Sequence, residues 1–123
     1  MATSAPPGIS IFRSTTEFES VPAGQAIFRE GEPGDVMFVV KEGEVDIIVH
    51  GTVIDTIGPG GLIGEMALID KQPRSATAVA KSDAKLVRID ERRFQHLVQQ
   101  TPFFALEVMR IMAHRLRQMD KRA

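Results

Sequence analysis

The sequence predicts a mainly β domain: an antiparallel β-barrel followed by two C-terminal helices. From residue 16 to residue 90, Gly and Pro recur at short intervals in "PAG", "EGEPGD", "KEG", "GPGG" and "KQP". The runs between them are rich in Val, Ile, Phe and Thr, a pattern typical of many brief strands joined by tight turns. After residue 90 the apolar residues take helical spacing. We therefore expect a flexible N-terminal segment, 1–15, and one domain, 16–123, with its barrel at 16–90 and its helices at 91–121.

Alternation inside the predicted barrel indicates how its strands are buried. "EVDIIVH" and "SATAVA" alternate well enough to give each strand one face in the core and one in water. The run of Ile47, Ile48 and Val49 interrupts that alternation and predicts burial on both faces at this point. The strands are expected to pair antiparallel.

Two helices are predicted after the barrel. Asp90 is a suitable N-cap for the first, whose apolar face carries Phe94, Leu97 and Val98. The second begins at Pro102, after Thr101 as its cap, and its apolar residues are Phe104, Leu106, Val108, Met109, Met112, Leu116 and Met119. The Met-rich stripe of this helix is interpreted either as core packing or as an exposed seam for a partner or a second copy. Burial is what distinguishes the two.

Length and composition restrict the classes of function. A chain of 123 residues is one domain that can bury a core without staples. It has no Cys, which excludes thiolate chemistry and zinc-thiolate sites and fits a reducing, cytoplasmic location. The net charge of -1 gives no field for a polyanion or a membrane surface, and no apolar run is long enough to span a bilayer. We expect a cytoplasmic protein with no membrane association.

Two charged residues lie inside an otherwise apolar stretch, "GLIGEMALIDKQPRSATAVA", residues 61–80. Burying Glu65 and Arg74 would be costly unless each has a partner. Gly64 lets the backbone approach a ligand where a short helix begins, and a helix start offers free N–H groups and a positive dipole end to a phosphate. The planar guanidinium of Arg74 suits the same phosphate, and Ser75 adds a hydroxyl donor.

Glu65 would be repelled by a phosphate, so it requires a neutral hydrogen-bond donor. A ribose 2′-OH is such a donor, and the ligand implied is a ribonucleotide with a compact phosphate. The alternative is a structural ion pair between Glu65 at the helix start and Arg74 at the strand start, with no ligand.

The stretch "IGEMALIDKQPRSATAVA" resembles the phosphate-binding cassette of the cyclic-nucleotide-binding domain family, of the catabolite-activator and protein kinase regulatory-subunit type. That cassette runs Phe-Gly-Glu-(Leu or Met)-Ala-Leu, a short turn, then Arg-(Ser, Thr or Ala)-Ala-(Thr or Ser). Upstream, "PAGQAIFREGEPGDVMFVVKEGEVDI" is similar to the first half of the family's barrel. Downstream, "FQHLVQQTPFFALEVMRIMAHRLRQ" is similar to the helices that follow it. The resemblance covers residues 16–118 and implies a double-stranded β-helix, or jelly roll.

The resemblance implies a cyclic nucleotide as ligand, cAMP in preference to cGMP, and a role for each matching residue. Glu65 would bind the ribose 2′-OH and Arg74 the cyclic phosphate. The remaining contacts would come from Gly64, Ser75, the backbone N–H groups of Met66 and Ala67, and the apolar side chains of Ile47 and Ile54.

Two departures from the family pattern stand out. Ile63 replaces the usual aromatic residue, a hydrophobic exchange expected to cost little. The last helix stops at Ala123, where that of the activator family runs on into a DNA-binding helix-turn-helix, so DNA binding is not expected. We expect a stand-alone module that acts on a separate partner or a second copy through its C-terminal helices, with Arg115 or Arg117 as candidates for a lid over the base.

Other function classes have less support. A metalloenzyme barrel would need clustered ligands, whereas His50, His96 and His114 are widely separated. No nucleophile and base can be paired, so we expect no enzyme. The main alternative to the sensor is a structural interaction or dimerisation module with a vestigial nucleotide pocket.

Overall fold

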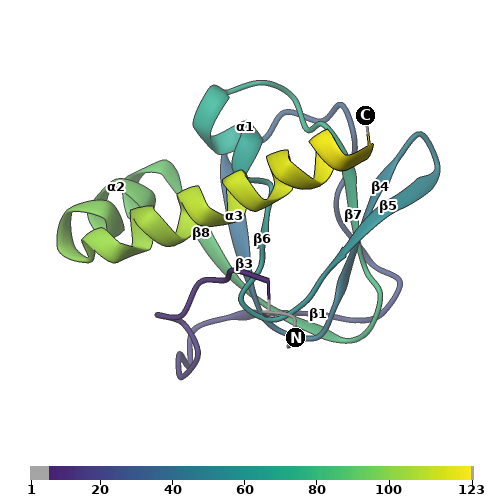
Figure 1. The fold of residues 1–123 in the computed structure, drawn as a ribbon. Helices are drawn as coiled ribbons and strands as arrows, with labels where there is room; N and C mark the ends of the chain where they lie inside the picture. Colours follow the sequence, from purple (N-terminus) through teal and green to yellow (C-terminus); the bar gives the residue numbers. More distant parts are fainter. Residues whose placement is uncertain (1–5, 123) are drawn as a thin grey trace, which may run out of the picture.

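The computed structural model describes residues 6–122 and forms two facing four-stranded antiparallel sheets with helices on one side (Figure 1). The first sheet has the order β1 (Glu19–Val21), β8 (Ala84–Asp90), β3 (Val36–Glu42) and β6 (Leu62–Ile63). The second has the order β2 (Ala26–Phe28), β7 (Thr77–Ala80), β4 (Val45–Val49) and β5 (Thr52–Ile57). This confirms the jelly-roll fold, although strand pairing among the described residues gives two sheets and not one closed barrel.

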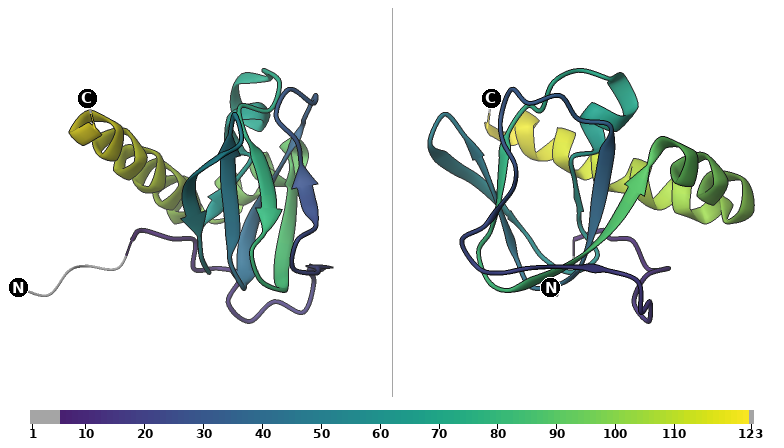
Figure 2. Two further views of the ribbon diagram at one scale, coloured as in Figure 1. Left: turned by 90° about the vertical axis from the view of Figure 1, so that its right-hand side faces the viewer. Right: turned by 180° about the vertical axis from the view of Figure 1, so that it is seen from behind.

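Strand β3 is buried on both faces. Its residues from Val36 to Val40 are all buried, whereas the run Ile47 to Val49, for which two-sided burial was predicted, is only partly buried. Met37 and Val39 belong to a core beneath the helices, and Phe38 and Val40 to a second core between the sheets. Alternate residues of β3 therefore join three layers: helices, first sheet and second sheet (Figure 2).

Three helices complete the fold: α1 (Glu65–Asp70), α2 (Glu91–Gln100) and α3 (Pro102–Arg122). The predicted cap of α2 is confirmed, because the Arg93 N–H donates to Asp90 Oδ1 at 2.8 Å. Phe94 of α2 meets Phe104 of α3 edge to face, with ring centroids 5.7 Å apart. The second half of α3 extends away from the sheets (Figure 2). Among residues 6–122, no helix has the length and apolar character that crossing a membrane requires.

Part of the segment expected to be flexible is packed on the core. Ile9 and Phe12 are buried in the cluster beneath the helices. The Ile9 N–H donates to Gly60 O at 2.7 Å, and the Ser10 hydroxyl donates to Glu107 Oε2 at 2.9 Å. The packed unit therefore begins before residue 16, since two apolar side chains reach a site under α3. Residues 1–5 of the predicted segment lie outside the described residues.

Candidate functional site

The turn from β6 into α1 requires a glycine. Gly64 has a φ of 76°, a left-handed conformation that favours glycine, and the predicted short helix starts directly after it. A Cβ there would lie 2.5 Å from Arg74 Nη1 and 3.3 Å from Val36 O. The absence of a side chain at residue 64 thus allows both the backbone turn and the close approach of the guanidinium.

Arg74 is 6% exposed and lies directly beside this turn. Its Nη1 donates to Gly64 O at 3.1 Å, and its guanidinium carbon lies 4.1 Å from the ring centroid of Phe28. Gly34 also adjoins it, since an added Cβ there would overlap the guanidinium. Arg74 Nε is buried without a hydrogen-bond partner among the described residues. Phe28 and Gly34 therefore both border the guanidinium, which keeps one donor unused.

The negative charges around Arg74 partly offset the cost of burying its guanidinium. Burial lowers the pKa of the Arg74 guanidinium, while the nearby carboxylates of Asp35, Glu32 and Glu65 raise that pKa. A guanidinium keeps its charge in proteins. The site is thus a buried, fixed cation with carboxylates around it.

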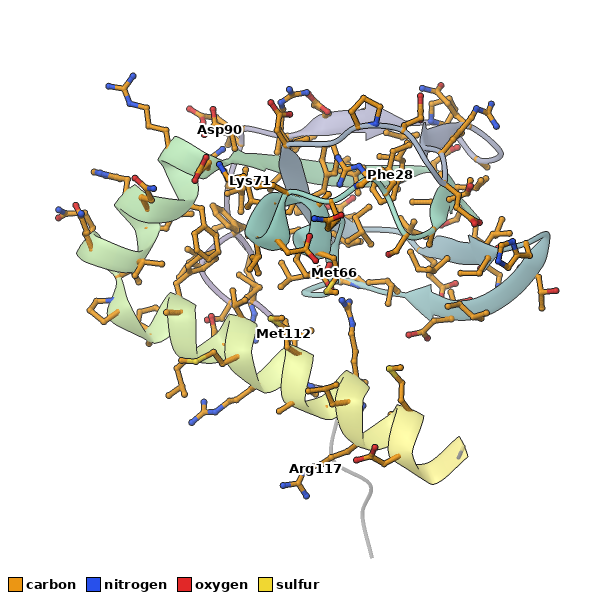
Figure 3. All side chains as sticks on the ribbon, turned by 90° about the horizontal axis from the view of Figure 1, so that it is seen from above. Phe28, Met66, Lys71, Asp90, Met112 and Arg117 are labelled. Carbon is orange, nitrogen blue, oxygen red and sulfur yellow. The ribbon has the colours of Figure 1, made fainter. Side chains whose placement is uncertain are left out.

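Glu65, the first residue of α1, is 5% exposed and has its charge partner on α3. Arg115 Nη1 forms an ion pair with Glu65 Oε1, and Arg115 Nη2 donates to the carbonyl oxygen of Leu62. The pairing predicted as the ligand-free alternative, Glu65 with Arg74, is therefore not the one that forms. Of the two lid candidates, Arg115 reaches the cassette, whereas Arg117 points away from the sheets (Figure 3).

The other predicted cassette residues differ in exposure. Met66 is exposed on the side of α1 toward α3 (Figure 3), and Ala67 is buried. Ser75 is exposed in the turn between Arg74 and β7. Because α1 begins at residue 65, the N–H groups of Met66 and Ala67 are in its first turn and have no acceptor within the helix.

The two predicted apolar wall residues come from the β4–β5 hairpin. Ile47 is partly buried and pairs with Ala78 of β7 on one side and with Asp55 of β5 on the other. The β4–β5 register shifts between Ile47 and Ile48, so Ile54 has no direct cross-strand partner at this bulge and is exposed. The structure brings Ile47 to the strand that follows the Arg74 turn, whereas Ile54 is not its cross-strand neighbour.

Three contacts at the site were not foreseen from the sequence: Phe28 against Arg74, Gly34 beside it, and Arg115 on Glu65. Each joins segments far apart in the chain. The glycines around residue 34 indicated turns, but not which side chain would pack against them. The only sequence signal for one of these contacts was the cost of burying Glu65, which requires that Glu65 have a partner.

A cavity of about 220 Å³ opens beside α1 and adjoins Gly34 and Ala67. The ion pair of Lys71 Nζ with Glu91 Oε2, 3.0 Å long, joins the end of α1 to the start of α2 at its edge. Among residues 6–122, no group of three or more His, Cys, Asp or Glu side chains could hold a metal ion. The site brings together a buried arginine, a buried glutamate and a helix start.

Comparison with known proteins identifies the same region. A family model described as "Cyclic nucleotide-binding domain" matches residues 18–101. The chain is 45% identical over 86 residues, or 70% of its length, to a cyclic nucleotide-gated potassium channel of Mesorhizobium japonicum. It is 31% identical over 121 residues, or 94% of its length, to the cyclic AMP receptor protein of Thermus thermophilus.

Solved structures agree with the sequence matches. The catabolite activator protein of Thermus thermophilus superposes with a TM-score of 0.75 at 33% identity, covering 85% of this chain and 53% of that one. The chain spans 24% of the potassium channel and 56% of the receptor protein. The likeness therefore concerns one domain of larger proteins.

Proposed function

The chain belongs to the cyclic nucleotide-binding domain family, and on that premise we propose that it is a non-catalytic sensor of cAMP, with cGMP as the weaker ligand. The observation that carries this proposal is Arg74. Its guanidinium is buried beside the start of α1, and its Nε has no partner in the described part of the chain. A buried donor without an acceptor costs about 1–3 kcal/mol. A cyclic phosphate at this point would supply the acceptor and the opposite charge.

The remaining ligand contacts follow from the same placement. We assign the phosphate also to the hydroxyl of Ser75 and to the N–H groups of Met66 and Ala67. Glu65 would accept from the ribose 2′-OH. The base and sugar would lie against the β4–β5 hairpin, on Ile47 and Ile54.

The preference for cAMP is supported by a relative whose name includes that nucleotide, the cyclic AMP receptor protein, which matches 94% of this chain. The exposed hydroxyl of Ser75 could also reach the guanine amino group of cGMP, so binding of both is expected. Competition of the two nucleotides for one site, measured by displacement of a fluorescent analogue, tests the order of affinities.

The test of the sensor function is thermal unfolding with cAMP, cGMP or 5′-AMP. A ligand at a hundredfold excess over its dissociation constant stabilises the folded state by about 2.7 kcal/mol, which raises Tm by about 10 °C for a domain of this size. We expect that rise with the cyclic nucleotides only. Arg74→Gln should abolish it, and Arg92→Gln, which changes an exposed arginine of α2, should leave it intact. No rise with any nucleotide in the wild type would refute the sensor function.

We assign the output to the exposed side of α3. Met109, Leu116 and Met119 are 57%, 62% and 62% exposed on this helix. A row of exposed apolar side chains suits a partner protein or a second copy of the chain. Ligand contact with the cassette would change the position of α2 and α3 and so the availability of this row. No DNA contact is part of the proposal.

The same exposed row supports the alternative, an interaction module with a vestigial pocket. In that case the association would be constant and independent of nucleotide. Sedimentation of the wild type and of Leu116→Glu, each with and without cAMP, separates the two. A nucleotide-dependent association that Leu116→Glu removes supports the sensor, and a nucleotide-independent one supports the interaction module.

A further inference from the structure

The turn of the β4–β5 hairpin lies beyond the strand that supports the hairpin. β4 pairs with β7 only from Val45 to Ile48, so the turn formed by His50 and Gly51 extends past the last paired residues (Figure 1). The φ angles of the two turn residues are 49° and 80°, both in the left-handed region. Hairpin turns of this kind favour Asn-Gly or Gly-Gly, so a histidine at the first position suggests a further role for its side chain.

One side chain, that of Glu30, joins this turn to another segment. Glu30 Oε1 accepts the backbone N–H of His50 at 3.2 Å, and Glu30 Oε2 lies 3.5 Å from His50 Nδ1. Within residues 6–122, no other hydrogen bond or ion pair connects residues 50–51 to a different part of the chain. The position of the hairpin turn therefore depends on the Glu30 carboxylate.

The segment that carries Glu30 also holds the Arg74 turn, and it does so through its backbone. The Gly31 N–H donates to Arg74 O, and the Arg74 N–H donates to Glu32 O, each at 2.8 Å. The N–H of Glu30 itself donates to Thr77 Oγ1 at 2.9 Å, at the start of β7. Glu30 thus contacts the Arg74 segment with its backbone and the hairpin with its side chain.

We propose that Glu30 is a positioning residue for the nucleotide, because its carboxylate holds the β4–β5 hairpin at a fixed distance from Arg74. This inference rests on the proposed function, in which the phosphate binds at Arg74 and the base and sugar lie against the hairpin. The phosphate of a cyclic nucleotide is fused to the ribose, so the ligand cannot stretch to meet a displaced hairpin. A hairpin that is held in place before binding reduces the ordering cost of association.

Substitution at Glu30 separates the two connections. The backbone contacts with the Arg74 segment persist in Glu30→Ala, whereas the contacts with His50 are lost. We expect the affinity for cAMP to fall about threefold to tenfold, the order of one hydrogen bond. Glu30→Gln retains an acceptor for the His50 N–H and should keep most of the affinity. Glu17→Ala is the matched control, since it changes an exposed glutamate in the loop before β1.

The first measurement is a double-mutant cycle by calorimetric titration with cAMP. Ile54→Ala removes part of the assigned apolar wall and should weaken binding in the wild type. It should cost less in Glu30→Ala, because a released hairpin already contributes less. Ser75→Ala, on the phosphate side, should cost the same in both backgrounds. Additive costs of Glu30→Ala and Ile54→Ala overturn the proposal, and so does wild-type affinity in Glu30→Ala.

The second measurement is hydrogen exchange of the His50 amide without ligand. Glu30→Ala should raise its exchange rate, because the N–H loses its acceptor, whereas Glu17→Ala should leave the rate unchanged. An unchanged rate in Glu30→Ala would show that the carboxylate does not hold the turn, and the proposal would be wrong.

The outcomes distinguish this inference from the proposed function. If the wild type binds no cyclic nucleotide, the sensor function and the role of Glu30 both fail. If the wild type binds cAMP and Glu30→Ala binds it equally well, the sensor function stands and only the role of Glu30 fails.

Discussion

Gly34→Ala is the sharpest test of how the domain positions its cation, because it changes a residue that contacts Arg74 and is not assigned to the ligand. A Cβ at residue 34 would overlap the Arg74 guanidinium, so that group must move. The backbone itself accepts alanine, since Gly34 is not one of the glycines with a positive φ. The perturbation is therefore confined to the position of one side chain.

The magnitude follows from the contacts that Arg74 would lose. Its hydrogen bond to Gly64 O contributes about 1 kcal/mol and its contact with the Phe28 ring about 1 kcal/mol. Replacing glycine returns about 0.4–1 kcal/mol through the unfolded state. The net loss of stability should be about 1 kcal/mol. Loss of a charge-assisted contact with the phosphate should weaken cAMP binding about 10- to 100-fold.

Calorimetric titration with cAMP and denaturant unfolding measure the two quantities. Gly58→Ala is the matched control, because a Cβ there meets nothing within 4 Å and its φ is not in the left-handed region. If Gly34→Ala binds cAMP as tightly as Gly58→Ala, Arg74 does not act from the position described, and the reasoning is refuted.

Three further predictions concern stacking, pH and the N-terminal segment. Phe28→Leu keeps an apolar side chain but removes the aromatic ring beside Arg74. The affinity for cAMP, measured by titration calorimetry, should fall about threefold to tenfold. An unchanged affinity would contradict a role for the ring. Lys85, through its hydrogen bond and charge, lowers the pKa of Glu42 below 4.5. The stability from this pair is thus present above 4.5 and is lost as pH falls through the lowered pKa. Lys85→Gln should flatten the acid side of the stability curve measured by denaturant unfolding, and an unaltered curve would count against the pair. Ile9→Ala should cost about 2–4 kcal/mol in the same assay, because the side chain is buried; a loss below 0.5 kcal/mol, the usual limit for surface substitutions, would show that the segment is not part of the core.

Local signals in the sequence predicted the order of elements and much of the candidate site. The Gly and Pro residues at short intervals predicted the succession of short strands, and Asp90 predicted the start of α2. The cassette motif located the turn at Gly64 and the return at Arg74. These succeed because a turn, a cap and a motif depend on neighbouring residues.

The contacts that complete the site depend on the folded chain and could not be predicted. Nothing in the spacing links Phe28 to Arg74 or Arg115 to Glu65, since each pair meets only when separate elements pack. Two-sided burial was assigned to Ile47 and its neighbours because they form an apolar run, but β3 lies between two cores. Ile9 lies in a segment with the composition of a tail, and its burial comes from its position under α3.

Its packed first half and its projecting second half make α3 a lever. Its pivot is the packed segment that ends at Ile111, and the Ser10 to Glu107 hydrogen bond holds the pivot from the other end of the chain. The arm from Ile111 to the end of the helix at residue 122 is roughly 16 Å long at 1.5 Å per residue. A rotation of about 20° at the pivot, which is within the range of ordinary helix packing differences, would move the tip by roughly 6 Å. Such a rotation would displace the far end of α3 by about the length of a side chain.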